Sequence, residues 1–137
     1  MEQVFNPYLP LTEYVPDGEP HVFNGRVYIY GSHDKSKGNA YCEDDYVTWS
    51  APVDNPKSWR YEGVIYRKNQ DPSNLDGSMQ LWAPDVVQGA DGRYYLYYCF
   101  GFYPEIGVAV SDSPAGPFEF YGHVKYPDSI KEGTILD

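Results

Sequence analysis

The feature that most constrains this chain is a short aromatic hairpin motif that occurs twice. The two copies read NGRVYIY and DGRYYLY, and they begin at positions 24 and 91, 67 residues apart. Asn-Gly and Asp-Gly are strong hairpin signals because their residues tolerate positive φ. The residues that follow alternate with period two and are rich in Tyr, Val and Ile, which is typical of strands. Because 12 Pro and 13 Gly leave little room for long helices, we predict an all-β chain.

Each hairpin is expected to belong to a unit of four strands. The same spacing of 67 places Asp45 on Asp112, beside candidate third strands at 39–44 and 106–111. An outer strand led by an aromatic residue follows at 59–63 and at 118–122, with a spacing of 59. We assign the difference of eight residues to the loop before the last strand.

Four-stranded units that repeat at this period suggest the blades of a β-propeller. A two-sheet sandwich with a chance likeness between hairpins is the alternative. We expect blade one at about 15–66, blade two at about 81–126 and the start of a third at 132–137, within a single domain over 1–137. Two blades cannot close a ring, so we expect the N-terminal part of a larger propeller, or a piece that assembles with other copies.

Composition excludes several classes of function. The formal net charge is −10, which disfavours a nucleic-acid partner, since such binding needs clustered Lys and Arg. Aromatic residues make up 18% of the chain, which argues against disorder. Apolar runs are too short for a membrane helix, and the N-terminus does not resemble a secretory signal, so we expect a cytoplasmic location. Cys42 and Cys99 form no metal-ligand cluster and are expected to be buried thiols.

Acidic residues precede the hairpin in each unit, at Asp17 and at Asp85, and Asp137 stands where a third copy begins. The first strands of propeller blades line the central channel, so these acids are expected to converge at one mouth. Gathered carboxylates repel one another and their pKa values separate. A glycosidase needs this arrangement, with one carboxyl ionised and another protonated. The alternative is that each acid caps a local turn.

Several motifs, in order, resemble glycoside hydrolase family 43, a family of five-bladed β-propellers whose members cleave arabinose- and xylose-containing glycans. The matching segments are NPYLP (6–10), YIYGSHD (28–34), DYVTWS (45–50), SWRYEGVI (58–65), LWAPDV (81–86) and GRYYLY (92–97). Together they span essentially the whole chain.

The resemblance implies roles for individual residues. Asp17 would be the catalytic base, with Glu19 as the alternative because Gly18-Glu19-Pro20 departs from the usual Asp-Pro-Ser. Asp137 would modulate the pKa of the general acid, a Glu of a later blade that this chain lacks. The predicted substrate-binding residues are His33, Trp82 and Asp85. We assign Trp49 and Trp59 to packing, and claim no metal and no cofactor.

The sequence therefore predicts the N-terminal part of an inverting glycoside hydrolase that acts on arabinan-, xylan- or arabinoxylan-type glycans. Without its general acid, the chain alone is expected to be inactive. The alternative is a carbohydrate-binding propeller module that oligomerises without cleaving sugar. In both cases, exposed blade edges are expected to favour self-association.

Overall fold

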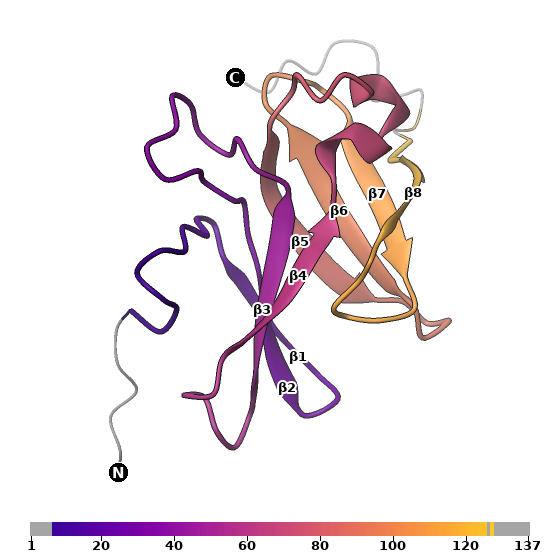
Figure 1. Ribbon diagram of the computed structural model, residues 1–137. Coiled ribbons are helices and arrows are strands. Elements are labelled where there is room, and N and C mark those ends of the chain that lie inside the picture. The colour runs from indigo at the N-terminus through magenta and orange to yellow at the C-terminus, as the bar shows by residue number, and fades with distance from the viewer. Residues whose placement is uncertain (1–6, 126, 128–137) are drawn as a thin grey trace.

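The protein consists of two four-stranded antiparallel sheets that pack against each other (Figure 1). The computed structural model describes residues 7–125 and 127. The strands of the first sheet are β1 (Glu19–Phe23), β2 (Arg26–Tyr30), β3 (Tyr46–Pro52) and β4 (Arg60–Tyr66). Those of the second are β5 (Leu81–Gln88), β6 (Tyr94–Phe100), β7 (Ile106–Ser111) and β8 (Glu119–His123). In each sheet the spatial order follows the chain, which confirms the predicted all-β architecture of two four-stranded units.

The two aromatic hairpins have different turns. In the first sheet, Asn24 and Gly25 both have positive φ, at 50° and 75°, and connect Phe23 directly to its partner Arg26. Such a two-residue turn matches the twist of the strands on either side. The second hairpin has a five-residue loop, 89–93, in which Gly92 takes the positive φ. Both turn dipeptides therefore mark hairpins, although only the first forms the tightest kind.

The predicted third strand at 39–44 is wrong. These residues lie in the long connection 31–45, and β3 begins only at Tyr46. A local reason is that the Glu43 carboxylate accepts hydrogen bonds from the backbone N–H groups of Asn39 and Ala40, which folds the segment into turns. The corresponding connection in the second sheet, 101–105, is much shorter. The length difference between the units thus lies before the third strand, not before the last.

The core lies between the two sheets and is dominated by aromatic side chains. Alternate residues of β6 face it, so that Tyr94, Leu96, Tyr98 and Phe100 are buried while Tyr97 between them is exposed. The fully buried large side chains are Tyr30, Tyr46, Tyr66, Tyr98, Phe118, Ile65, Leu81 and Leu96. The phenol of Tyr66 lies 2.7 Å from that of Tyr98, which ties the outer strand of one sheet to the second strand of the other.

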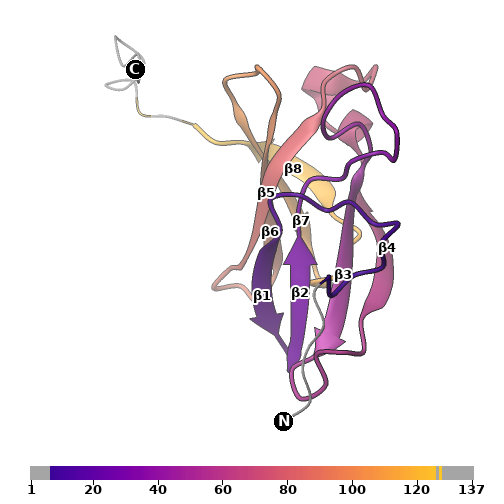
Figure 2. The ribbon, with the colours of Figure 1, turned by 90° about the vertical axis from the view of Figure 1, so that its left-hand side faces the viewer.

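Trp49 and Trp59 pack as predicted, away from the core between the sheets. Trp49 lies against Tyr61 with ring centroids 5.2 Å apart, and its indole N–H donates to Glu13 at 2.6 Å. The ring of Trp59 lies 5.2 Å from that of Tyr8. The N-terminal segment that precedes β1 therefore covers part of the first sheet, and Figure 2 shows it running across the strands.

The first strands of the two sheets lie side by side and run in the same direction. His21 of β1 contacts Asp85 of β5, and Asn24 at the end of β1 donates to Tyr94, which pairs with the last residue of β5. Both strands consequently begin at the same end of the molecule. We call this end the mouth; it also carries the connections 31–45 and 101–105, since β2 and β6 end there.

We expect Tyr30→Phe to lower the free energy of unfolding by about 1–2 kcal/mol. The buried phenol of Tyr30 donates to the carbonyl of Pro114 at 2.6 Å, and burial raises its pKa, so the group stays a donor. Phenylalanine keeps the ring but leaves the carbonyl without this donor. Urea denaturation measures the change. Tyr14→Phe, in the exposed N-terminal segment, is the control, and equal losses in the two variants would contradict the expectation.

Candidate active-site mouth

Asp17 lies at the mouth, two residues before β1 begins. It is linked to the second sheet through the side chain of Ser32. Its backbone has φ of 55°, a left-handed conformation that Asp tolerates better than most residues. Its carboxylate Oδ2 lies 3.4 Å from the hydroxyl of Ser32, which follows β2 and is fully buried. The same hydroxyl accepts the backbone N–H of Ala83, in β5, at 2.8 Å. Ser32 thus joins the predicted base to the start of the second sheet.

Trp82 lies beside the contact between Ser32 and Ala83, and two hydrogen bonds to its backbone carbonyl hold it in place. Its carbonyl accepts the phenol of Tyr46 at 2.8 Å and the thiol of Cys99 at 3.6 Å. Its ring lies over Gly101 and meets the ring of Phe102 nearly edge-on, with centroids 5.3 Å apart. Phe102 is almost completely exposed, at 99%. An apolar aromatic pair at the rim offers the kind of surface on which a sugar ring can stack.

Asp85 makes a contact that the sequence did not predict. Its Oδ1 lies 2.6 Å from Nε2 of His21, and it also accepts the backbone N–H of Val86. The acid therefore links the first strands of the two sheets. The predicted equivalence of Asp17 and Asp85 is wrong. Asp85 pairs with Tyr97 as Glu19 pairs with Tyr30, so Asp85 corresponds to Glu19.

The position in the second sheet that corresponds to Asp17 is Ala83. Each of these residues lies two positions before an acid of the first strand, and each has positive φ, 55° for Asp17 and 35° for Ala83. The second strand of each unit shows a similar correspondence. Ser32 and Cys99 both lie two residues after a paired tyrosine, and each contacts a residue at the mouth.

Both ring nitrogens of His33 face protein groups. Nδ1 lies 3.1 Å from the carbonyl oxygen of Asp45, and Nε2 lies 3.7 Å from the Glu13 carboxylate. Glu13 is the same residue that accepts the Trp49 indole N–H. His33 therefore ties the connection 31–45 to the N-terminal segment, and its role in sugar binding stays a prediction.

Asp137 lies outside the described residues. Within 7–125 and 127, no group of three or more His, Cys, Asp or Glu side chains is arranged to hold a metal ion. The same part of the chain contains no helix of the length and apolar character that crossing a membrane requires.

The two cysteines are free thiols near the mouth. Cys42 is buried and Cys99 is half-buried, and burial raises the pKa of both, so the protonated thiol is the favoured form. Asp17 contributes to the raised pKa of Cys42 because its negative charge is close. Cys42 is thus a buried thiol as predicted, whereas Cys99 is only half-buried. Sequence reasoning missed Ser32, although the repeat places it level with Cys99.

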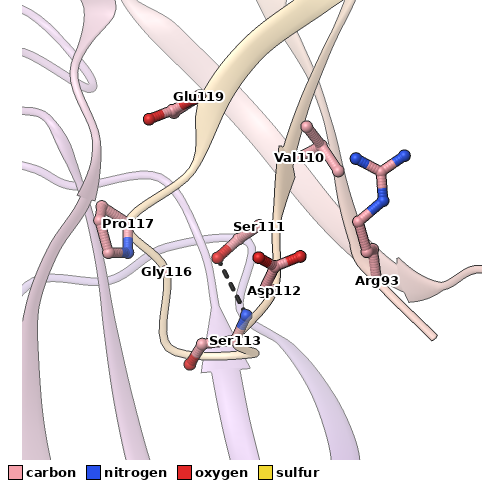
Figure 3. Close-up of a pocket in the computed structure, with 8 residues that line it drawn as sticks. All are labelled: Arg93, Val110, Ser111, Asp112, Ser113, Gly116, Pro117 and Glu119. Carbon is pink, nitrogen blue, oxygen red and sulfur yellow. Dashed lines mark hydrogen bonds between the residues drawn. The ribbon is translucent and has the colours of Figure 1, made fainter.

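A pocket of about 340 Å³ lies at the opposite end of the second sheet (Figure 3). It is lined by Arg93, Val110, Ser111, Asp112, Ser113, Gly116, Pro117 and Glu119. The guanidinium of Arg93 is already hydrogen-bonded to Asp91 at 2.9 Å and lies over the ring of Tyr95. Because this pocket is far along the strands from Asp17, we place the candidate site at the mouth.

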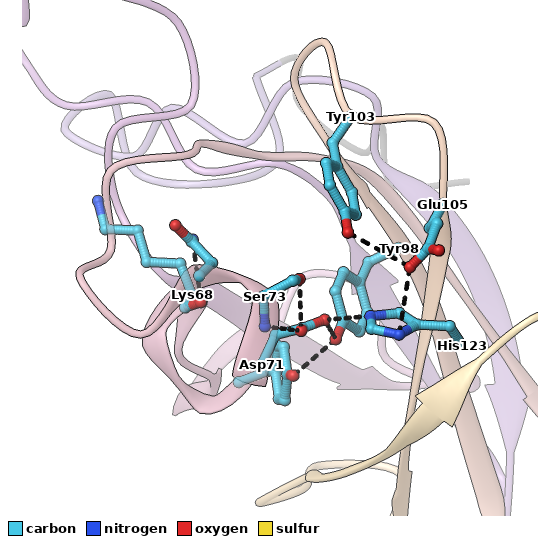
Figure 4. A network of polar contacts seen from close by, with 9 residues as sticks. Lys68, Asp71, Ser73, Tyr98, Tyr103, Glu105 and His123 are labelled. Carbon is cyan, nitrogen blue, oxygen red and sulfur yellow. Dashed lines mark hydrogen bonds and ion pairs between the residues drawn. The ribbon is translucent and has the colours of Figure 1, made fainter.

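A second polar cluster fixes the segment that connects the sheets (Figure 4). Asp71, between the two short 3₁₀ helices Lys68–Gln70 and Pro72–Asn74, is fully buried. One of its oxygens accepts the N–H and hydroxyl of Ser73, at 2.8 and 2.6 Å. The other accepts the phenol of Tyr98 at 2.6 Å and lies 3.0 Å from Nε2 of His123. Burial raises the pKa of Asp71, but these hydrogen bonds outweigh it, and the pKa is lowered overall.

Comparison with known proteins places these features in context. The family described as "Glycosyl hydrolases family 43" matches residues 55–137. A xylosidase/arabinosidase of Thermoclostridium stercorarium is 64% identical over 96% of this chain and 28% of its own length. Xylosidase/arabinosidase 43A of Humicola insolens is 41% identical over 90% of this chain and 38% of its own length. The chain therefore spans about a third of these relatives.

Among solved structures, a GH43 enzyme of Xanthomonas citri complexed with xylotriose is similar in both fold and sequence. It superposes with a TM-score of 0.70 at 32% identity, over 83% of this chain and 33% of that one.

Proposed function

Because the chain belongs to glycosyl hydrolases family 43, we propose that it forms the first two blades of a larger inverting glycoside hydrolase acting on arabinose- or xylose-containing glycans. The two four-stranded sheets, whose first strands run parallel and begin at one mouth, support this proposal. The names of the two xylosidase/arabinosidase relatives support the choice of sugars.

In the proposed reaction, the Asp17 carboxylate takes a proton from a water molecule while the oxygen of that water attacks the anomeric carbon. The glycosidic oxygen leaves with a proton from a general acid, which the family resemblance assigns to a Glu of a later blade. An inverting enzyme needs space for the water, with its two carboxyl groups about 6.5–9.5 Å apart. The observation that supports Asp17 most directly is its place before β1, joined through Ser32 to Ala83 of β5.

The proposal is tested with the whole protein and with the 137-residue chain, each given nitrophenyl arabinofuranoside and nitrophenyl xyloside. We expect turnover only with the whole protein, and proton NMR should show that the sugar is first released with inverted anomeric configuration. Release with retained configuration would contradict the inverting mechanism. Saturable glycan binding without turnover by the whole protein would instead favour a carbohydrate-binding module.

The chain on its own is expected to self-associate through the outward face of the second sheet. That face exposes Val87, Tyr97 and Tyr121, and no described segment covers them. Exposed apolar faces of this kind favour association. In sedimentation velocity, Tyr121→Glu should shift the chain toward monomer. Tyr41→Glu, in the exposed connection 31–45, is the matched control and should have little effect. A chain that is monomeric at all concentrations would refute this expectation.

A further inference from the structure

Ser32 occupies an unusual place, because two separate segments meet at its buried hydroxyl. Asp17 approaches from the residues before β1, and the backbone N–H of Ala83 approaches from β5. The side chain itself is fully buried, so water does not compete for these bonds.

The chemistry of these neighbours fixes the direction of the hydrogen bonds. A serine hydroxyl has one proton to donate and two lone pairs to accept with. The Ala83 N–H can only donate. The Asp17 carboxylate can only accept. The hydroxyl proton is therefore directed at Asp17, while a lone pair of the hydroxyl accepts from Ala83.

We propose that Ser32 is a positioning residue for Asp17: its hydroxyl donates to Oδ2 of the carboxylate and holds the other oxygen toward the mouth. This inference rests on the proposed function, in which Asp17 is the base. The Asp17 side chain is otherwise exposed, so a fixed donor on one oxygen restricts its rotation. Because the hydroxyl is also bonded to Ala83, the base keeps its place relative to the second sheet.

A purely structural role for Ser32, as a link between the sheets, makes a different prediction. Loss of a link lowers stability and leaves the kcat of the folded enzyme as it was. Loss of a group that orients the base lowers kcat in the folded enzyme with little change in KM, because the carboxylate is less often aligned with the attacking water. The kcat of the folded fraction therefore separates the two roles.

The experiment compares Ser32→Ala and Ser32→Thr in the whole protein. For Ser32→Ala we expect kcat to fall about tenfold with KM nearly unchanged. Ser32→Thr keeps the hydroxyl and should return kcat toward the parent. Values of kcat are normalised to the folded fraction measured by circular dichroism.

The matched control is Ser50→Ala. Ser50 is also buried and also donates to a carboxylate, that of Glu62, but it lies in β3 and makes no contact with Asp17. We expect Ser50→Ala to lower the melting temperature without lowering the kcat of the folded fraction.

The outcomes separate this inference from the proposed function. If Asp17→Asn removes activity while Ser32→Ala leaves kcat unchanged, the positioning role is wrong and the function stands. If Ser32→Ala lowers only the melting temperature, Ser32 is a structural link and the inference is overturned. If Asp17→Asn retains full activity, the assignment of the base fails.

Discussion

Replacing Asp17 by asparagine in the whole protein is expected to lower kcat about a thousandfold, with little change in KM. General-base catalysis is worth about 10²–10⁴-fold, and asparagine cannot take the proton of the attacking water. The substitution is nearly isosteric, and the amide oxygen can still accept from Ser32 and fill the same space beside β1. The measurement is steady-state hydrolysis of nitrophenyl arabinofuranoside or xyloside, with circular dichroism to show that the variant folds.

Glu19→Gln is the informative control for this prediction, because the departure from the family pattern left Glu19 as the alternative base. Glu19 opens β1, pairs with Tyr30 and is exposed. Its substitution should change kcat by less than about threefold. A large loss in Glu19→Gln together with an active Asp17→Asn would move the base two residues along the chain and contradict the assignment.

The sequence predicted those parts of the fold that local patterns determine. The alternation at Arg26–Tyr30 has the bounds of β2, and the candidate strand at 106–111 has those of β7. The strand predicted at 39–44 was wrong because its position was inferred from the repeat alone. The Glu43 side chain there bonds backbone N–H groups of its own segment, and the strand starts after it. Local hydrogen bonds of this kind compete with strand pairing.

The candidate site was predictable only in part. Position and family resemblance single out Asp17 and Trp82, and continuing the register of the first hairpin places Asp17 opposite Ser32. No local pattern connects Ser32 to Ala83, 51 residues away. The bond between His21 and Asp85 spans 64 residues. Such contacts depend on how two sheets pack, which the sequence of either sheet does not specify. Two signals for Ser32 were available: the register of the first hairpin, which places it opposite Asp17, and the alignment of the second strands, which places it level with Cys99.

The second large effect is expected at the connection between the sheets, where Asp71→Ala should lower the free energy of unfolding by about 3 kcal/mol. The buried carboxylate of Asp71 is hydrogen-bonded to Ser73, Tyr98 and His123. Its removal leaves several buried donors without an acceptor. Burial raises the pKa of Tyr98, as do its bonds to Asp71 and Tyr66, so its phenol remains a donor. Urea denaturation of the chain measures the loss. The control is Asp76→Ala, an exposed acid of the same connection that accepts the Ser78 N–H, and its loss should be much smaller.

The same residue should make stability depend on pH in a defined direction. Because the folded-state pKa of Asp71 is lowered, the unfolded chain binds its proton first as the pH falls. The stabilisation from Asp71 is therefore complete above the unfolded value of about 4 and is lost as the pH falls through the folded value. Asp71→Asn keeps one acceptor oxygen but does not titrate, so its free energy of unfolding should fall less steeply over this acidic range. Parallel acid limbs for the parent and Asp71→Asn would show that other carboxyl groups govern the acid sensitivity. A shallower limb in the variant would identify the buried link between the sheets as the part of the structure that acid weakens.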